Sequence, residues 1–437
     1  MKNLLYILLF LAPFSTSSQN VLNLQEVLQI GLEYNFDIQI VRNEARISSN
    51  NVTRGNAGFL PTVGISGGYS ARVSNANQFP RNADEVTRIR NSQTHSLDAG
   101  VSLNWTIFEG FRVQTNYRRL QELQTIGELN VRLTIENLIS NLTAEYYNYV
   151  HQHLRLITMQ QAVALSRERL RIVEAHYQVG SRSMLDVRQA RVDFNADSAQ
   201  LILQHEVLIR SQIRLNELMG IDVNTQFEPE ASSIEFNPFL IRDDLQASMM
   251  QYNTLLQLTD QSRVLSELEL RMLESRNFPF MRLNTGYGFS NLNYNRGTLD
   301  RQRTWGPNVG ITIGYTLFDG FNRRREQQNA RIVIENRELE IARRTQWLQS
   351  DFANMWVAYQ NNIELVHLEV QSVENARLNY EIAMERFLLG DLGGFQLREA
   401  QNGLMAAEQR LLTARYRTKL YEISLLQISG RIGEFLE

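Results

Sequence analysis

The sequence contains no cysteine and little proline, and each scarcity excludes a class of protein. Without cysteine, a chain of 437 residues has no disulfide scaffold, no zinc-finger cysteine site, no thiol catalysis and no lipid-modified N-terminal cysteine. With only 7 prolines and 24 glycines, it is neither collagen-like nor a proline-rich disordered chain. The formal net charge of −3 gives no electrostatic footprint for nucleic acid, so no nucleic-acid partner is predicted.

Motifs for catalysis and for cofactor binding are also missing from the sequence. His151 and His153 are two residues apart, so on a helix they point about 200° apart and cannot share a metal ion. The glycine pairs at 67–68 and 393–394 lack the strand-to-helix frame of a phosphate-binding loop. No Ser/His/Asp arrangement or carboxylate pair stands out beyond composition. The sequence therefore predicts no enzyme, no cofactor and no metal site.

The N-terminus has the pattern of an export signal. Lys2 gives a short positive region, residues 4–11 are apolar, and residues 15–18 are small. The apolar run is shorter than the roughly 20 residues of a spanning helix, so we predict a signal peptide over 1–18 rather than an anchor or a buried helix. No later stretch has the apolar length of a spanning helix, so helices are not expected to hold the mature chain in a membrane.

The chain contains an internal repeat. Residues 106–111 (Thr-Ile-Phe-Glu-Gly-Phe) recur as residues 316–321 (Thr-Leu-Phe-Asp-Gly-Phe), at an offset of 210 residues. Upstream, residues 60–61 (Leu-Pro) match residues 278–279 (Phe-Pro) at an offset of 218. The two offsets differ by 218 − 210 = 8 residues, a length change that falls in the polar, loop-like stretch 75–95. Ordered matches of this kind indicate a duplicated structure.

Each half has the same predicted order of elements. A helical segment, at 22–57 or 240–276, is followed by two alternating segments joined by a polar loop, then by a very long helical segment, a glycine-marked turn and a return helix. We predict a first repeat over 19–220, a linker or equatorial region over 221–239, a second repeat over 240–430 and a C-terminal tail over 431–437.

The long helical segments are unusual in length. Residues 111–179 contain no proline and one glycine, and residues 321–389 contain neither. Each has about 70 residues, which as one continuous helix would be about 105 Å long. Apolar residues recur at three- and four-residue steps, the period of coiled-coil packing. We predict a long antiparallel coiled-coil body rather than a compact helical bundle.

Four segments alternate between apolar and small or polar residues, at 62–73, 97–107, 281–290 and 305–317. A membrane β-strand needs about 9–11 residues, apolar outside and polar inside. The pattern also suits a soluble sheet with one face on a core, but the export signal and the lack of cysteine favour the membrane. The side chains predicted to face lipid are Val101, Leu103, Trp105, Val309, Ile311 and Ile313.

Four strands cannot close a barrel by themselves. The smallest membrane barrels have about 8 strands, and open edges are excluded in lipid because unpaired backbone groups cost several kcal/mol each. Copies of the chain must therefore share one barrel. Two copies would give 8 strands, which side chains tend to fill, and three would give 12, which begin to leave a lumen.

The chain resembles the TolC-like outer-membrane channel family of Gram-negative envelopes over nearly its whole mature length. The resemblance rests on the duplicated order of elements, on the strand-to-helix junctions 108–110 (Phe-Glu-Gly) and 318–320 (Phe-Asp-Gly), and on the sequences of the helical turns. The first turn, at 177–187, is close to the family pattern, and the second, at 387–396, diverges after its glycine.

The resemblance implies an α+β membrane protein and a homotrimer. Its shared 12-stranded β-barrel lies in the lipid of the cell outer membrane and continues as a helical coiled-coil tunnel across the periplasm. The implied function is a passive exit duct of a tripartite efflux pump or type I secretion system, which docks an inner-membrane transporter through a periplasmic adaptor protein. The alternative from another class is a soluble exported coiled-coil scaffold or rod-like adhesion protein.

The resemblance also implies site residues. The family carries acidic residues at the tunnel constriction, six and nine positions after the second turn's glycine, which here are Gln396 and Glu399. A ring of three Glu399 carboxylates would concentrate cations, although Glu399 also reads as an ordinary solvated helix position. The turns, whose glycines also suit left-handed helix caps, would be the surface that the adaptor grips. Those residues are Gly180, Ser181, Arg182, Gly390 and Asp391.

Overall fold

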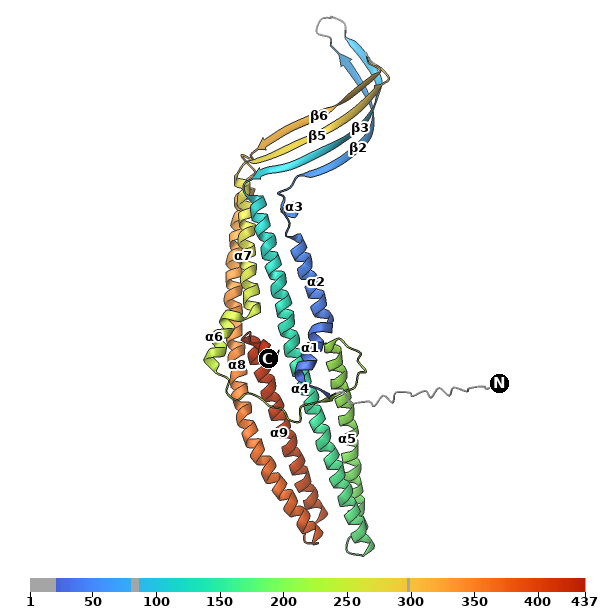
Figure 1. Ribbon diagram of the computed structural model, residues 1–437, viewed down its shortest axis with the longest axis vertical. Coiled ribbons are helices and arrows are strands. Elements are labelled where there is room, and N and C mark those ends of the chain that lie inside the picture. The colour runs from blue at the N-terminus through green and yellow to red at the C-terminus, as the bar shows by residue number, and fades with distance from the viewer. Residues whose placement is uncertain (1–20, 80–85, 297–298, 437) are drawn as a thin grey trace, which may run out of the picture. The chain divides into compact units, whose positions relative to one another are not determined.

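The computed structural model describes residues 21–79, 86–296 and 299–436 (Figure 1). The predicted signal peptide, 1–18, lies outside these residues. The described residues form two compact units: a helical unit of residues 21–41, 131–255 and 344–436, and a strand-bearing unit of residues 42–130 and 256–343.

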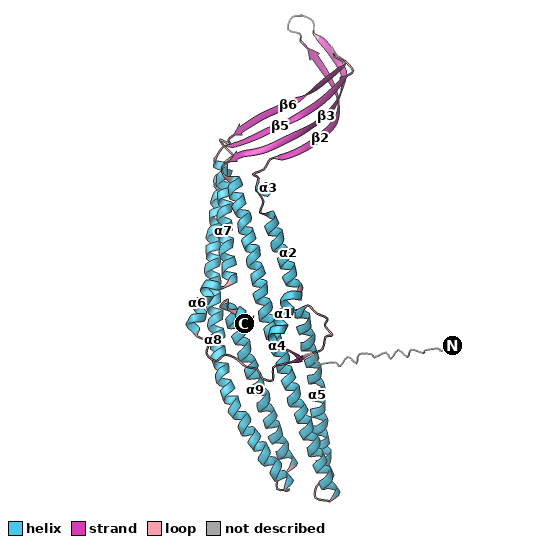
Figure 2. Ribbon diagram, viewed as in Figure 1, coloured by secondary structure: helices cyan, strands magenta, loops and turns pink. Residues whose placement is uncertain are grey.

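Figure 2 shows that helices make up most of the fold and that the long strands belong to one sheet. The helices are α1 (Leu24–Tyr34), α2 (Phe36–Asn51), α3 (Arg54–Ala57), α4 (Arg112–Gln178), α5 (Met184–Met219), α6 (Arg242–Tyr252), α7 (Thr254–Glu274), α8 (Asn322–Leu388) and α9 (Gly394–Ile428). The strands are β1 (Val21–Leu22), β2 (Thr62–Gln78), β3 (Thr87–Glu109), β4 (Glu228–Pro229), β5 (Phe280–Tyr294) and β6 (Arg301–Gly314). Short 3₁₀ turns occupy η1 (Ser275–Asn277) and η2 (Ile432–Leu436).

The two long helices, α4 and α8, have 67 residues each and no break. Their bounds fall within one residue of the segments 111–179 and 321–389, so the predicted long helices are confirmed. The near absence of glycine and the absence of proline explain their continuity, because no residue removes a backbone donor or adds flexibility. In the described part of the chain, no helix combines the length and the apolar character needed to cross a membrane.

Each repeat divides its first helical segment at an asparagine, a break that the sequence did not predict. Asn35 separates α1 from α2, and its side-chain amide donates a hydrogen bond of 2.9 Å to the Leu218 carbonyl. Asn253 separates α6 from α7 and donates in the same way to the Ile428 carbonyl, at 2.9 Å. Both acceptors lie in the last turn of a return helix, where carbonyls have no donor within the helix. The break therefore joins the first helix of each repeat to its last.

The return helices end at glycines that no other residue replaces well. Gly220 and Gly430, which follow α5 and α9, both have a φ of 74°. A Cβ atom at Gly220 would lie 2.6 Å from the Tyr34 carbonyl oxygen, and one at Gly430 would lie 2.9 Å from that of Tyr252. Glycine thus allows both the left-handed turn and the close approach to the first helix of the same repeat.

The four long strands form one antiparallel sheet in the order β2-β3-β5-β6. The stretch 75–95 was predicted to be a loop, and this prediction was wrong for most of its described residues. β2 continues to Gln78, and β3 begins at Thr87. Polar residues extend the strands because the ladder is made by backbone groups and does not need apolar side chains. At the other end of the sheet, β6 stops at Gly314, three residues before the predicted end.

Gly220→Ala is expected to destabilise the protein by about 2–4 kcal/mol, from the left-handed backbone and the clash with the Tyr34 carbonyl. Gly180→Ala is the matched control, because Gly180 has a φ of 79° but no atom within 4 Å of its added Cβ. It should cost only about 1–2 kcal/mol. Denaturant unfolding of both purified variants measures the difference. Equal losses would mean that the close approach at Tyr34 does not constrain the fold.

Candidate functional site

The turns between the long and the return helices are hydrogen-bonded left-handed caps. At the first turn, the Gly180 amide donates to the Tyr177 carbonyl at 3.0 Å and the Ser181 amide donates to that of His176 at 2.9 Å. The second turn repeats the pattern, with a φ of 81° at Gly390. Two such bonds satisfy carbonyls that the end of a helix leaves free. The glycines therefore have a structural role at both turns.

Among the predicted turn residues, Arg182 reaches the other turn. Its guanidinium donates to the Leu392 carbonyl at 2.9 Å and lies 5.3 Å from the centre of the Phe387 ring. Ser181 and Asp391 instead bond within their own turns, Ser181 to the His176 carbonyl and Asp391 to Arg386. The structure thus brings both turns together, and Arg182 is the side chain that joins them.

Two charged contacts lie behind the turns, and sequence reasoning missed both. Asp197 on α5 and Arg398 on α9 form a two-pronged ion pair at 2.6 and 2.7 Å, and Asp193 on α5 pairs with Arg169 on α4. The Asp197 hydrogen bond raises the pKa of Arg398. The four-residue spacing of the two aspartates places them on one helix face, which is the only signal that the sequence carried.

The free face of α9 is a stripe with alternating spacings of three and four residues. We name it the α9 stripe. Its members are Gln396, Glu399, Gly403, Ala406, Arg410, Thr413 and Arg417, and all except the half-buried Thr413 are exposed. The opposite face of α9 is buried, with Leu397 and Leu404 among its residues. One polar face of α9 is therefore mostly exposed within the described residues, although Arg410 on it contacts Glu369 on α8.

The two predicted constriction residues lie at the start of the α9 stripe and differ in their contacts. The Gln396 side-chain oxygen accepts a hydrogen bond of 2.9 Å from the Gly393 amide, at the first turn of α9. Glu399 is exposed, and within the described residues it forms no hydrogen bond or ion pair. Gln396 thus caps the helix, which gives the neutral amide a structural role. The Glu399 carboxylate has no partner among the described residues and can interact with ions or solutes.

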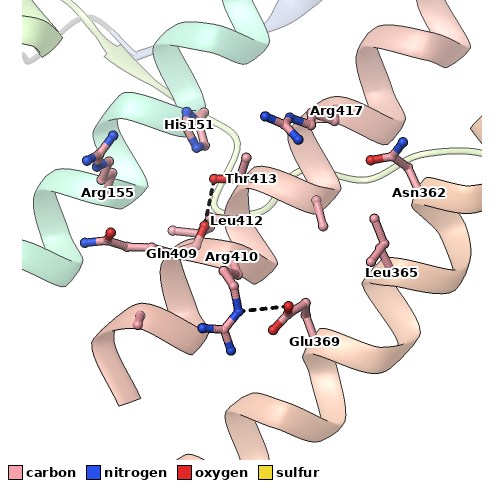
Figure 3. A pocket seen from close by; sticks show the side chains of 12 residues that line it. His151, Arg155, Asn362, Leu365, Glu369, Gln409, Arg410, Leu412, Thr413 and Arg417 are labelled. Carbon is pink, nitrogen blue, oxygen red and sulfur yellow. Dashed lines mark hydrogen bonds and ion pairs between the residues drawn. The ribbon is translucent and has the colours of Figure 1, made fainter. Parts of the chain in front are cut away.

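A cavity of about 650 Å³ opens between α4, α8 and α9 (Figure 3). His151 and Arg155 extend from α4, Glu369 from α8, and Arg410 and Arg417 from α9. Sequence reasoning did not identify this cavity, because its lining comes from three helices distant in the sequence.

His151 forms a buried, uncharged part of the cavity wall. Its side chain is 7% exposed and stacks on the Tyr416 ring, with centroids 4.9 Å apart. Burial, helped by the positive charge of Arg155, lowers the pKa of His151 to about 4.

The register of the sheet separates an apolar face from a face of small residues. Val101 pairs with Ile65 and with Tyr287, whereas the adjacent Gly100 pairs with Gly288. Directly paired residues point to the same side, so each row crosses the sheet on one face. The apolar face carries all six side chains that were predicted to meet lipid: Val101, Leu103, Trp105, Val309, Ile311 and Ile313.

An open-edged sheet with one apolar face, joined to paired long helices, defines a protomer of an outer-membrane channel. The chain belongs to the outer membrane efflux protein family, whose family model matches residues 27–221 and 253–431.

Its relatives include outer membrane protein TolC of Vibrio cholerae serotype O1, 22% identical over an alignment of 431 positions that covers 95% of this chain and 91% of that one. Outer membrane protein TolC of Escherichia coli K12 is 23% identical over an alignment of 458 positions, gaps included, which covers 99% of this chain and 87% of that one.

Solved structures have the same fold at lower identity. The Campylobacter jejuni CmeC outer membrane channel superposes with a TM-score of 0.75 at 16% identity, over 93% of this chain and 85% of that one. The outer-membrane channel OprN gives 0.73 at 18% identity, over 93% and 89%.

The comparisons confirm the TolC-like resemblance, the mostly helical fold with four long strands per chain, and the outer-membrane location that the sequence predicted. The chain is an efflux channel protein of the outer membrane, and the family is one of passive channels. The exported scaffold or adhesion rod is not favoured.

Acid should destabilise the helical unit through His151. The unfolded histidine titrates near pH 6.5 and the folded one near 4, so the stability that neutral His151 gives is complete above pH 6.5 and is lost as the pH falls toward 4. By pH 5 the loss is about 2 kcal/mol. His151→Phe keeps an aromatic ring against Tyr416 and should remove this part of the acid sensitivity.

The measurement is the free energy of unfolding at pH 7.5 and at pH 5. His205→Gln, an exposed position on α5, serves as control and should behave like the unmodified protein. An unchanged acid loss in His151→Phe would contradict the assignment.

Proposed function

We propose that three copies of the chain close one 12-stranded barrel in the outer membrane and give efflux substrates a passive exit. The main observation in support of this shared barrel is that the outer edges of β2 and β6 have no partner strand in the part of the chain that the structure describes. In lipid each unpaired backbone group costs several kcal/mol. Pairing β6 of one copy with β2 of the next satisfies both edges, and a closed ring of copies leaves none.

The small-residue face supports three copies over two. Ser66, Gly100, Gly288 and Gly306 form one continuous row across the four strands. Turned inward, such rows leave the centre of the barrel free of large side chains. In an 8-stranded barrel side chains fill the interior, so a face without them would leave a void there, whereas 12 strands with small inward residues leave a passage.

The apolar face then turns toward lipid. Val309, Ile311 and Ile313 on β6 are 74%, 62% and 65% exposed in the single chain. Such a contiguous apolar patch is unfavourable in contact with water. Burial of this face in the hydrocarbon of the outer membrane removes it from water and stabilises the assembly.

At the other end of the duct, we assign the turns to docking. A periplasmic adaptor protein would grip the two turns at Gly180, Ser181, Arg182, Gly390 and Asp391, and would connect the duct to an inner-membrane transporter. The left-handed glycines support this role, because no atom lies within 4 Å of where a Cβ would be at Gly180 or Gly390. The backbone of both turns is therefore accessible to a partner.

We assign the constriction to Gln396 and Glu399 of three copies. Three Glu399 carboxylates around a narrow opening would attract cations and repel anions. Opening would be a movement of the helix ends about the turns at Gly180 and Gly390. The free carboxylate of Glu399 on an open helix stripe supports this role.

Charge on the lipid face should prevent assembly. Val101→Arg is expected to cost about 2–4 kcal/mol per copy in the bilayer, because the guanidinium is buried in hydrocarbon. Ser102→Arg, one residue away on the opposite face, is the matched control and should assemble normally. The measurement is the native mass of the detergent-extracted protein and its yield from outer membranes.

The unmodified protein should have the mass of three mature chains. A stable monomer, or a protein that is soluble without detergent, would refute the shared barrel. Equal yields of the Val101→Arg and Ser102→Arg variants would refute the assignment of the two faces. Ile311→Arg and Thr312→Arg repeat the comparison on β6.

Neutralising Glu399 should weaken the preference of the duct for cations. Glu399→Ala removes three negative charges from the proposed constriction, so we expect a lower cation-to-anion permeability ratio and an altered closed-state conductance in planar bilayers. Glu206→Gln on α5 makes an equal change of charge at an exposed position and should leave both unchanged. Unaltered conductance and selectivity in Glu399→Ala would remove Glu399 from the constriction.

A further inference from the structure

The cavity between α4, α8 and α9 has an excess of positive charge (Figure 3). Arg410 donates from Nε to Glu369 Oε1 at 2.9 Å, so one arginine is balanced by the one carboxylate in the lining. Neither Arg155 nor Arg417 forms an ion pair with any residue that the structure describes. Since His151 is neutral above about pH 4, the cavity has a net charge of about +2 at neutral pH.

Two polar atoms of the lining are buried without a hydrogen bond. Nε of Arg155 is a donor and Oε2 of Glu369 is an acceptor, and neither meets a partner within the described residues. Buried polar groups in proteins are nearly always hydrogen-bonded, because an unpaired group loses its water without compensation. Both side chains line the cavity, but the two atoms themselves are covered by neighbouring atoms, so a ligand reaches them only when the side chains turn.

The rest of the wall combines apolar side chains with the neutral polar side chains of Asn362, Gln409 and Thr413. Leu365 comes from α8, and Leu412 and Ala414 come from α9. The volume of about 650 Å³ lies within the range of about 300–1,000 Å³ that small-molecule sites occupy. Apolar walls with a few charged groups favour an organic molecule over an inorganic ion.

The position of the cavity along α9 relates it to the constriction. Arg410 and Arg417 belong to the α9 stripe, 11 and 18 residues after Glu399. At 1.5 Å per residue they lie about 16 and 27 Å further along the same helix face. If Glu399 lines the duct, these two arginines line it too, deeper than the constriction.

We propose that this cavity is a binding site for organic anions on the wall of the duct, one site in each copy. Arg155 and Arg417 bind the carboxylate, sulfonate or phosphate of the ligand, and its apolar body packs on the leucines. The location inside the duct rests on the function proposed above. The site itself does not, because all its residues belong to a single chain.

Binding of dyes of opposite charge to the purified full-length protein tests the proposal. 5-Carboxyfluorescein is an organic anion with an aromatic body, and rhodamine 6G has a related ring system with a positive charge. Fluorescence anisotropy in a non-ionic detergent gives both dissociation constants. We expect the anion to bind and the cation to bind at least about tenfold more weakly, with affinity for the anion falling as salt is added.

Variants then assign the site. Each lost charge-assisted hydrogen bond should weaken binding about tenfold, so the double variant Arg155→Gln/Arg417→Gln should lose about 100-fold. Glu369→Gln should bind the anion more tightly, because it removes a repelling carboxylate and leaves Arg410 unneutralised. Arg415→Gln is the matched control: it is on the same helix, makes the same change of charge and does not line the cavity, so binding should be unchanged.

No binding of the anion, equal loss in Arg415→Gln and in the double variant, or weaker binding in Glu369→Gln would each overturn the proposed site. These results leave the mass and the conductance of the assembly untouched, so they do not count against the channel. Conversely, a protein that binds the anion through Arg155 and Arg417 but fails to form a trimer would refute the duct and retain the site.

Discussion

Backbone groups at the two outer edges of the four-stranded sheet need hydrogen-bond partners, and the rest of the architecture depends on this constraint. Within the described residues, neither β2 nor β6 has a strand on its outward side. Water could satisfy such edges, but the hydrocarbon of a membrane cannot. A single copy is therefore incomplete as a membrane protein. Because each repeat supplies only two strands, duplication alone does not remove the edges, and closure requires further copies.

In the helical unit, one face of α9 is exposed while the opposite face is buried. The buried face carries charges held in pairs. Lys419 bonds to Glu422 at 3.0 Å, Glu422 in turn accepts from the Asn237 amide at 3.1 Å, and burial raises the pKa of Glu422. Nearer the start of the same helix, Arg398 forms an ion pair with Asp197 on α5. The Asn237 contact and the Asp197 pair join α9 to other segments, and because such buried contacts are costly to break they fix the rotation of α9 about its axis.

With its rotation fixed, α9 presents a stripe whose chemistry changes along its length. An amide and an acid lie near the turn, Gly403 and Ala406 follow, and two arginines lie beyond. In the proposed duct a solute would meet these groups in a set order, the carboxylates at the constriction and the arginines further along α9. The opposite signs of charge would let one passage hold an anionic solute in its wall and still concentrate cations at its narrow end.

The sequence by itself determined the long helices, the strand pattern, the duplication and the family. These depend on local features: no proline over 67 residues of α4 or α8, a two-residue alternation in Val101, Leu103 and Trp105, and motifs repeated at a constant offset. Such patterns are legible because hydrogen bonds and side-chain direction within one element follow from neighbours in the chain.

Only the tertiary structure decided the breaks at Asn35 and Asn253, the ion pair of Asp197 with Arg398, and the cavity that includes Arg155 and Arg417. Each of these needs groups that are roughly 175 to 260 residues apart to meet at hydrogen-bond or cavity distance. The sequence shows that an asparagine or an arginine is present, but whether its polar atoms are paired is set by which distant helix packs against it.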